Sequence, residues 1–160
     1  MSASDNQKRI ASAVALATAL AVPAEGLRQW AYNDTGGILT TCYGHTGKDV
    51  VKGKAYTLDE CKQLLNADML NAVRTVENCT TNLPVNVLAA FSDVTYNEGP
   101  TAACDTKHST AARYLKAGMT KEACKELPKW NKAKVAGVLV PLPGLTKRRN
   151  AEMQVCMQSV

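Results

Sequence analysis

Hydrophobic residues recur at helical spacing along much of the chain. The clearest run has apolar side chains three, four, seven and four residues apart: Leu58, Cys61, Leu65, Ala72 and Val76. This spacing places them on one face of a helix. Thr57 and Glu60 supply a capping box at its start, because a hydroxyl at the cap is followed three residues later by a carboxylate.

Shorter helices are predicted beyond this one. Pro84 suits the first turn of a helix that runs to about Tyr96, and the N-E-G-P sequence at 97–100 ends it. Three more helices are expected at 110–117, 120–127 and 145–157. Thr120 is expected to cap the second of these, Gly118 to end the first and Gly144 to open the last.

The segment 33–56 has a different pattern. It holds five glycines, at 36, 37, 44, 47 and 53, among Ile, Thr, Tyr and Val. Such a turn-rich stretch predicts a β-hairpin or a small meander. The sequence therefore predicts an α+β fold that is mostly α, with a small β-lobe at about 33–56 and a helical lobe at about 57–160.

The amino-terminal segment contains an apolar run from Ile10 to Val22, preceded by Lys8 and Arg9 and followed by Pro23. A positive flank before an apolar run is typical of a signal sequence. A helix over this run spans about 20 Å, against about 30 Å for the membrane core. Cleavage after residue 24 would leave Glu25 without a preceding helical turn, which argues against a cleaved signal peptide. Two interpretations stay open for residues 1–24: a weak membrane anchor, or an ordinary apolar helix packed in the domain.

Charge and cysteine content narrow the class of protein. The net charge of +5 favours an anionic partner, and no basic run with interleaved aromatics points to nucleic acid. Six cysteines, without a C-x-x-C pair, favour disulfides in an oxidising compartment. With two histidines and no paired ligand spacing, no metal site is predicted. Six cysteines allow about 15 pairings, so the connectivity stays open.

Two acidic residues near the β-lobe fit the chemistry of glycoside hydrolysis, which needs one protonated and one ionised carboxyl group. Glu25 directly follows the apolar segment, which is expected to desolvate it and raise its pKa. Asp34 lies in the polar turn N-D-T-G-G, which is expected to keep it ionised. Thr40 follows on the next strand, where its hydroxyl can hold a water. We expect Glu25 and Asp34 to flank a groove between the β-lobe and the helices.

The spacing of these three residues, E-x8-D-x5-T, resembles the signature of phage-type lysozymes (endolysins), including those of T-even and lambdoid phages. The resemblance extends over E-G-L-R-Q-W-A-Y-N-D-T-G-G-I-L-T, Y-G-H-T-G, T-L-D-E-C-K-Q-L-L-N-A-D, Y-N-E-G and G-L-T-K-R-R-N-A-E, and so covers about residues 25–156. The amino terminus resembles the signal-arrest-release segment of some lambdoid endolysins. The implied fold is lysozyme-like, with an active-site cleft between the two lobes.

The resemblance implies hydrolysis of the β-1,4 bond between N-acetylmuramic acid and N-acetylglucosamine in bacterial peptidoglycan, causing host cell lysis without a cofactor. Glu25 would be the general acid, Asp34 the base or charge stabiliser, and Thr40 the residue that positions water. Inversion is the implied outcome, with carboxyl groups about 6.5–9.5 Å apart. The implied protein is a monomer made in the host cytoplasm that acts in the periplasm after release from the inner membrane, which residues 8–24 would contact transiently.

With this resemblance, we also expect particular roles or positions for further residues. His45 is expected to pair with Asp68 and so hold the β-lobe to a helix. Asn97 and Arg148 are expected near the substrate, with Arg148 or Arg149 reaching either Glu25 or the carboxylates of the wall. The alternatives are a helix-stopping role for Asn97 and a solvated basic helix face for the two arginines. Placement on the predicted elements favours one set of disulfides: Cys42–Cys61, Cys124–Cys156 and, from the remainder, Cys79–Cys104. Trp130 is expected in the core and His108 on the surface.

Two other classes of protein fit parts of the pattern. A lytic transglycosylase would need Glu25 alone and would deliver no water. A non-catalytic wall-binding module braced by disulfides would bind the wall without releasing sugar fragments.

Overall fold

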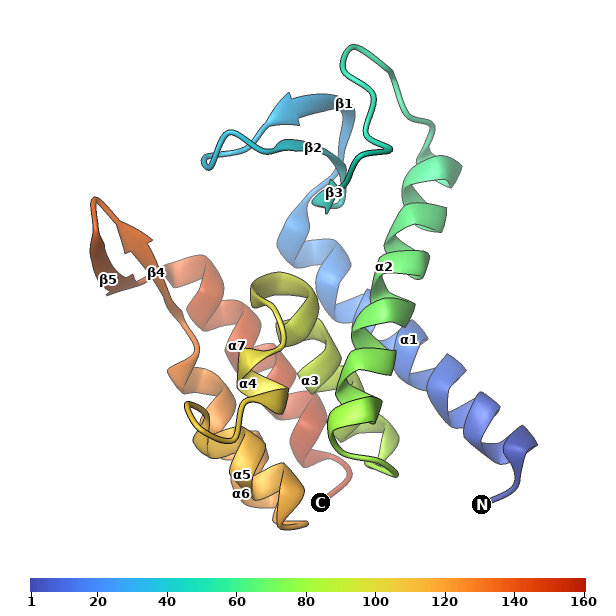
Figure 1. Cartoon of the computed structure of the whole chain (residues 1–160), viewed down its shortest axis with the longest axis vertical. Helices are drawn as coiled ribbons and strands as arrows, with labels where there is room; N and C mark the ends of the chain where they lie inside the picture. Colours follow the sequence, from blue (N-terminus) through green and yellow to red (C-terminus); the bar gives the residue numbers. More distant parts are fainter.

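A computed structural model describes residues 1–160 as a bundle of helices with a small antiparallel sheet at one end (Figure 1). The long helices are α1 (Ala3–Glu25), α2 (Leu58–Cys79), α3 (Val85–Glu98) and α7 (Pro143–Met157). The short ones are α4 (Thr101–Cys104), α5 (Thr110–Lys116), α6 (Thr120–Glu126) and the 3-10 turn η1 (Leu127–Lys129). The α+β, mostly α fold predicted from the sequence is confirmed.

The small sheet consists of β1 (Arg28–Asn33), β2 (Leu39–Cys42) and β3 (His45–Thr46), paired antiparallel in that order. It begins five residues before the segment 33–56 that the glycine pattern marked, because Arg28 already pairs with Cys42. A β-bulge between Arg28 and Tyr32 bends β1. The sheet lies at the end of α1 and beside the start of α2 (Figure 1).

Helix α1 is packed into the core along its small side chains. Ala13, Ala17 and Ala21 recur every four residues and are completely buried, which lets the backbone of α1 approach α3 and α2 closely. Arg9 anchors the amino-terminal part of α1 through an ion pair with Glu77 and a 2.9 Å hydrogen bond to the carbonyl oxygen of Leu83. No helix of the chain is both long and apolar enough to span a bilayer.

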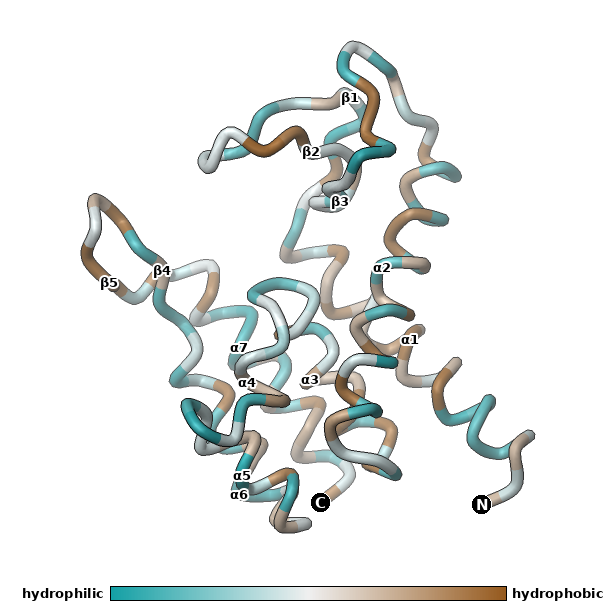
Figure 2. Tube along the Cα trace, viewed as in Figure 1, coloured by the Kyte–Doolittle hydropathy of each residue, from teal (hydrophilic) through white to brown (hydrophobic).

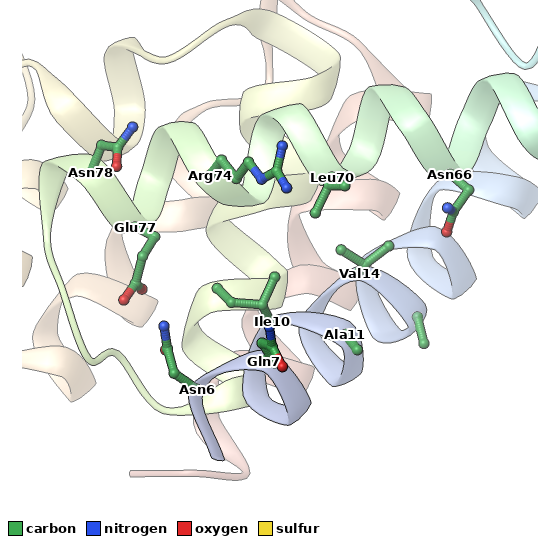
Figure 3. Close-up of a pocket in the computed structure, with 11 residues that line it drawn as sticks. Asn6, Gln7, Ile10, Ala11, Val14, Asn66, Leu70, Arg74, Glu77 and Asn78 are labelled. Carbon is green, nitrogen blue, oxygen red and sulfur yellow. The ribbon is translucent and has the colours of Figure 1, made fainter. Parts of the chain in front are cut away.

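A groove of about 560 Å³ runs between α1 and α2 on the outer face (Figure 3). Ile10, Val14 and Leu70 line its apolar floor, and Asn66, Arg74 and other polar side chains stand along its length. The core continues beneath it around α3, whose residues from Val87 to Thr95 are all buried.

Two local expectations were wrong. Thr120 does not cap α6; Met119 holds the cap position and makes no side-chain hydrogen bond there. The segment between η1 and α7, assigned to the helical lobe, forms a hairpin of β4 (Lys132–Val135) and β5 (Val138–Pro141). Its two-residue turn carries positive φ at Ala136 and Gly137, as this turn type requires. The hairpin projects from the bundle, and its largely hydrophobic β5 stays exposed (Figures 1 and 2).

Candidate active site

Glu25 is the last residue of α1, and Gly26, with a φ of 69°, ends the helix and turns the chain into β1. Its Oε1 accepts a 2.5 Å hydrogen bond from Nη1 of Arg148 on α7. Its Oε2 lies against Gly44, where a Cβ atom would come within 3.1 Å. With 20% of its side chain exposed, Glu25 is held between α7 and the turn that joins β2 to β3.

Arg148 is shared between two carboxylates. Its Nε and Nη2 donate to both oxygens of Asp93 on α3, at 3.0 and 2.7 Å, while Nη1 remains for Glu25. Burial lowers the pKa of Arg148, but its hydrogen bonds and charge pairing with Asp93 and Glu25 outweigh burial and raise the pKa overall. Arg148 is thus a fixed cation beside Glu25 and has little surface open to a substrate, since 5% of its side chain is exposed.

Asp34 and Thr40 are linked through the backbone of Ile38. Oδ1 of Asp34 accepts hydrogen bonds from the N–H groups of Gly36 and Ile38, at 2.8 and 2.9 Å. The hydroxyl of Thr40 donates to the carbonyl oxygen of Ile38 at 2.9 Å. Thr40 has therefore used its proton, and its oxygen can only accept a hydrogen bond, for example from water.

Glu25 and Asp34 lie at opposite ends of β1, and no hydrogen bond or ion pair joins them. None of the four principal hollows is lined by Glu25, Asp34 or Thr40, so the expected groove between them is not among the main cavities. The local contacts explain this. Asp34 folds onto its own turn, and Glu25 is occupied by Arg148 and Gly44.

Gly44 also lines a hollow of about 300 Å³. Its lining is mostly polar: Gly44, Thr46, Asp68, Asn71, Ala72, Thr75, Thr95 and Tyr96. The hydroxyl of Tyr96 donates to the carbonyl oxygen of Tyr43 and so fixes the turn that carries Gly44. Burial, with a smaller contribution from the negative charge of Glu25, raises the pKa of Tyr96, so Tyr96 keeps its proton.

The structure brings His45 and Asp68 together, with Nδ1 and Oδ2 2.6 Å apart, and so joins β3 to α2. It adds Asp49, whose carboxylate lies 3.1 Å from Nε2. Burial lowers the pKa of His45, but hydrogen bonds and charge pairing with Asp68 and Asp49 raise it overall. Asp49 was missed in the sequence, where its only signal is its position four residues after His45 in a loop.

The six cysteines form the three disulfides Cys42–Cys61, Cys79–Cys104 and Cys124–Cys156. Asn97 accepts a hydrogen bond from Nη2 of Arg149, which is completely buried. Trp130 packs against the core, and His108 is exposed beside Asp105. The sequence also gave no indication of Asp93, a buried acid on an apolar helix, as a partner of the site.

Comparison with known proteins defines the class. The muramidase domain of SpmX from Asticaccaulis excentricus superposes with a TM-score of 0.78 at 28% identity, covering 88% of this chain and 94% of that one. The endolysin from Escherichia coli O157:H7 phage FAHEc1 gives a TM-score of 0.76 at 31% identity, covering 93% and 92%. The SAR-endolysin of Bacteriophage PS119 is 39% identical over 134 residues, which are 83% of this chain and 76% of that protein.

The fold is thus lysozyme-like, and the similarity to endolysins supports a peptidoglycan-degrading enzyme. The model of the phage lysozyme family matches residues 23–152. This chain belongs to the phage lysozyme family.

Proposed function

We propose that the enzyme hydrolyses the β-1,4 bond between N-acetylmuramic acid and N-acetylglucosamine, with Glu25 as general acid, Asp34 as base and Thr40 as the residue that positions water. The observation that carries the proposal is the fixed position of Glu25 at the end of α1, between Arg148 and Gly44. A carboxyl group locked by packing and by a charged partner is pre-organised for proton transfer to a bound sugar.

In the proposed reaction, Glu25 donates a proton to the glycosidic oxygen as the bond to the anomeric carbon breaks. A water attacks that carbon from the opposite face and gives its proton to Asp34. Oδ2 of Asp34 is the oxygen that its turn leaves free. Thr40 accepts a hydrogen bond from the water, in keeping with a hydroxyl that already donates to Ile38.

Delivery of water to the opposite face inverts the anomeric carbon. In the complex with substrate, this mechanism requires the two carboxyl groups to lie about 6.5–9.5 Å apart. Proton NMR spectra taken in the first minutes of hydrolysis of a soluble muropeptide oligomer should show the α-anomer as the first product. A β-anomer as the first product contradicts the role given to Asp34.

The direct test uses purified peptidoglycan and the variants Glu25→Gln and Asp34→Asn. Glu122→Gln on α6 is the matched control, because 40% of the Glu122 side chain is exposed. Both site variants should lose nearly all activity while Glu122→Gln keeps it. Product analysis separates the rivals: a reducing end means hydrolysis, whereas an anhydro end means a lytic transglycosylase. Wall binding without release of fragments would indicate a wall-binding module.

The setting of this activity is part of the same proposal. The enzyme acts as a monomer on the wall in the host periplasm, where its three disulfides can form. Residues 25–160 form the catalytic domain, and residues 8–24 contact the inner membrane before the helix packs. Fractionation of host cells before lysis would test this: a chain found only in the cytoplasm contradicts the proposal.

A further inference from the structure

A buried group of charged side chains lies behind Glu25. Asp93 on α3 and Arg149 and Glu152 on α7 are completely buried, and Arg148 is nearly so. Asp93 and Glu152 approach the same atom, because Nε of Arg148 lies 3.0 Å from Oδ2 of Asp93 and 3.7 Å from Oε1 of Glu152. The group connects directly to the site, since Arg148 also binds Glu25.

Glu152 is the member without adequate partners. Neither of its carboxylate oxygens accepts a hydrogen bond, and its nearest cations are Nε of Arg148 at 3.7 Å and Nη1 of Arg149 at 3.3 Å. Ionised carboxylates buried without hydrogen bonds are strongly disfavoured. The observed surroundings therefore suit a neutral carboxylic acid.

The contacts of Asp93 set it apart from Glu152. Both oxygens of Asp93 accept N–H groups of Arg148, and such charge-assisted bonds favour the carboxylate. Glu152 has no such bond, so a proton shared between these two buried acids belongs on Glu152.

We propose that Glu152 is a positioning residue: it stays protonated, donates a hydrogen bond to Asp93, and so fixes the guanidinium of Arg148 against Glu25. The proposal rests on the role of Glu25 as general acid. Ionisation of Glu152 would place a second full negative charge beside Nε of Arg148. The guanidinium would then be drawn toward Glu152 and away from Glu25, and proton transfer would lose its pre-organised geometry.

The electrostatics of the surrounding groups support this. Burial raises the pKa of Glu152 well above its ordinary value and Asp93 raises it further, while Arg149 and Arg148 lower it less. Two further carboxyl groups lie near the two arginines: Glu25 at the end of α1, which binds Arg148, and Glu98 at the end of α3, whose charge acts on Arg149. Partial burial also raises the pKa of Glu98.

Glu152→Gln and Glu152→Leu separate positioning from packing. Glutamine keeps a neutral donor for Asp93, so kcat at neutral pH should stay within about twofold of wild type. At alkaline pH the wild type should lose activity as Glu152 ionises, whereas Glu152→Gln should keep its activity. Leucine removes the donor, and kcat on soluble peptidoglycan fragments should fall by about tenfold or more with KM nearly unchanged. Glu122→Gln is the matched control, and circular dichroism establishes folding.

A readout independent of activity is carboxyl carbon NMR of the wild type, with the Glu152 resonance assigned by its absence in Glu152→Gln. Glu152 should remain protonated at pH 7. The proposal is overturned if Glu152 is ionised at that pH, or if folded Glu152→Leu keeps the kcat and pH profile of the wild type. If Glu152→Leu does not fold, the NMR titration and the pH profile of Glu152→Gln still decide. An active Glu25→Gln would instead refute the proposed function, whatever the state of Glu152.

Discussion

Arg148 donates one N–H group to Glu25 at 2.5 Å and two to Asp93, and it thereby connects three helices at a single guanidinium. Glu25 ends α1, Asp93 belongs to α3 and Arg148 to α7. A planar side chain with five donors can satisfy both carboxylates at once, which a lysine cannot do. The position of the proposed acid therefore depends on contacts between elements far apart in the sequence.

Replacing Arg148 with methionine should impair both folding and activity. Two carboxylates lose their cation, and breaking a buried ion pair typically costs about 3–5 kcal/mol. The free energy of unfolding in urea should fall by that order, and wall lysis per folded molecule should fall steeply. Arg148→Lys keeps the charge and should recover part of the stability but little activity. If both variants lyse walls as wild type does, Arg148 has no part in placing Glu25.

Gly44 offers a way to disturb Glu25 from the other side. In Gly44→Ala the new Cβ atom would meet Oε2 of Glu25 at 3.1 Å, in a backbone with a φ of 83°. Gly53→Ala is the matched control, because its φ is 80° and nothing lies within 4 Å of the added atom. Both variants should lose about 1 kcal/mol of stability from backbone strain, but only Gly44→Ala should lose most of its activity. Equal activity in the two variants would show that Glu25 tolerates displacement.

His45 should titrate above its ordinary value, and Asp68→Asn should lower its pKa. Because the pKa of folded His45 is raised above that of the unfolded chain, its contribution to stability is full below about pH 6.5 and is lost as the pH rises through the folded-state pKa. Histidine NMR titration of wild type and variant checks the shift, with exposed His108 as an internal reference. An unchanged His45 titration in Asp68→Asn would refute the pairing.

The alanine stripe of α1 should be intolerant of larger side chains. Ala17 is completely buried, so Ala17→Leu should lower the free energy of unfolding by about 1–3 kcal/mol through overpacking. Ala19 on the same helix is exposed, and Ala19→Leu should have almost no effect. Denaturant unfolding of both variants makes the comparison. Matching losses would mean that the helix is not packed as described.

Elements with local signals were predictable from the sequence. The capping box at Thr57 opens α2 as expected, with the hydroxyl accepting the N–H of Glu60. The β4–β5 hairpin was not predicted, because its turn uses Ala136 where Asn or Asp usually stands, and the flanking strands alternate poorly. Thr120 resembled a cap, but the helix begins one residue earlier than that role requires.

The candidate site also contains residues with a local sequence signal and residues without one. Glu25, Asp34 and Thr40 could be proposed from their spacing, and the contact of Arg148 with Glu25 was one of the options for that residue. Asp93 and Glu152 had no local signal, because a single acid on an apolar helix gains meaning only from what packs against it. The open groove was expected from the two acids alone, but Glu25 is occupied by Arg148 through the tertiary fold, and Asp34 is occupied by its own turn.

The disulfides join the elements of the molecule into two separate sets. Cys42–Cys61 and Cys79–Cys104 join β2, α2 and α4, whereas Cys124–Cys156 joins α6 and α7. Glu25 touches one residue from the vicinity of each: Gly44 beside the first and Arg148 within the second. The carboxyl group of Glu25 thus lies between two parts of the molecule that no disulfide joins. Relative motion of these two parts would change the surroundings of Glu25 without straining a disulfide bond.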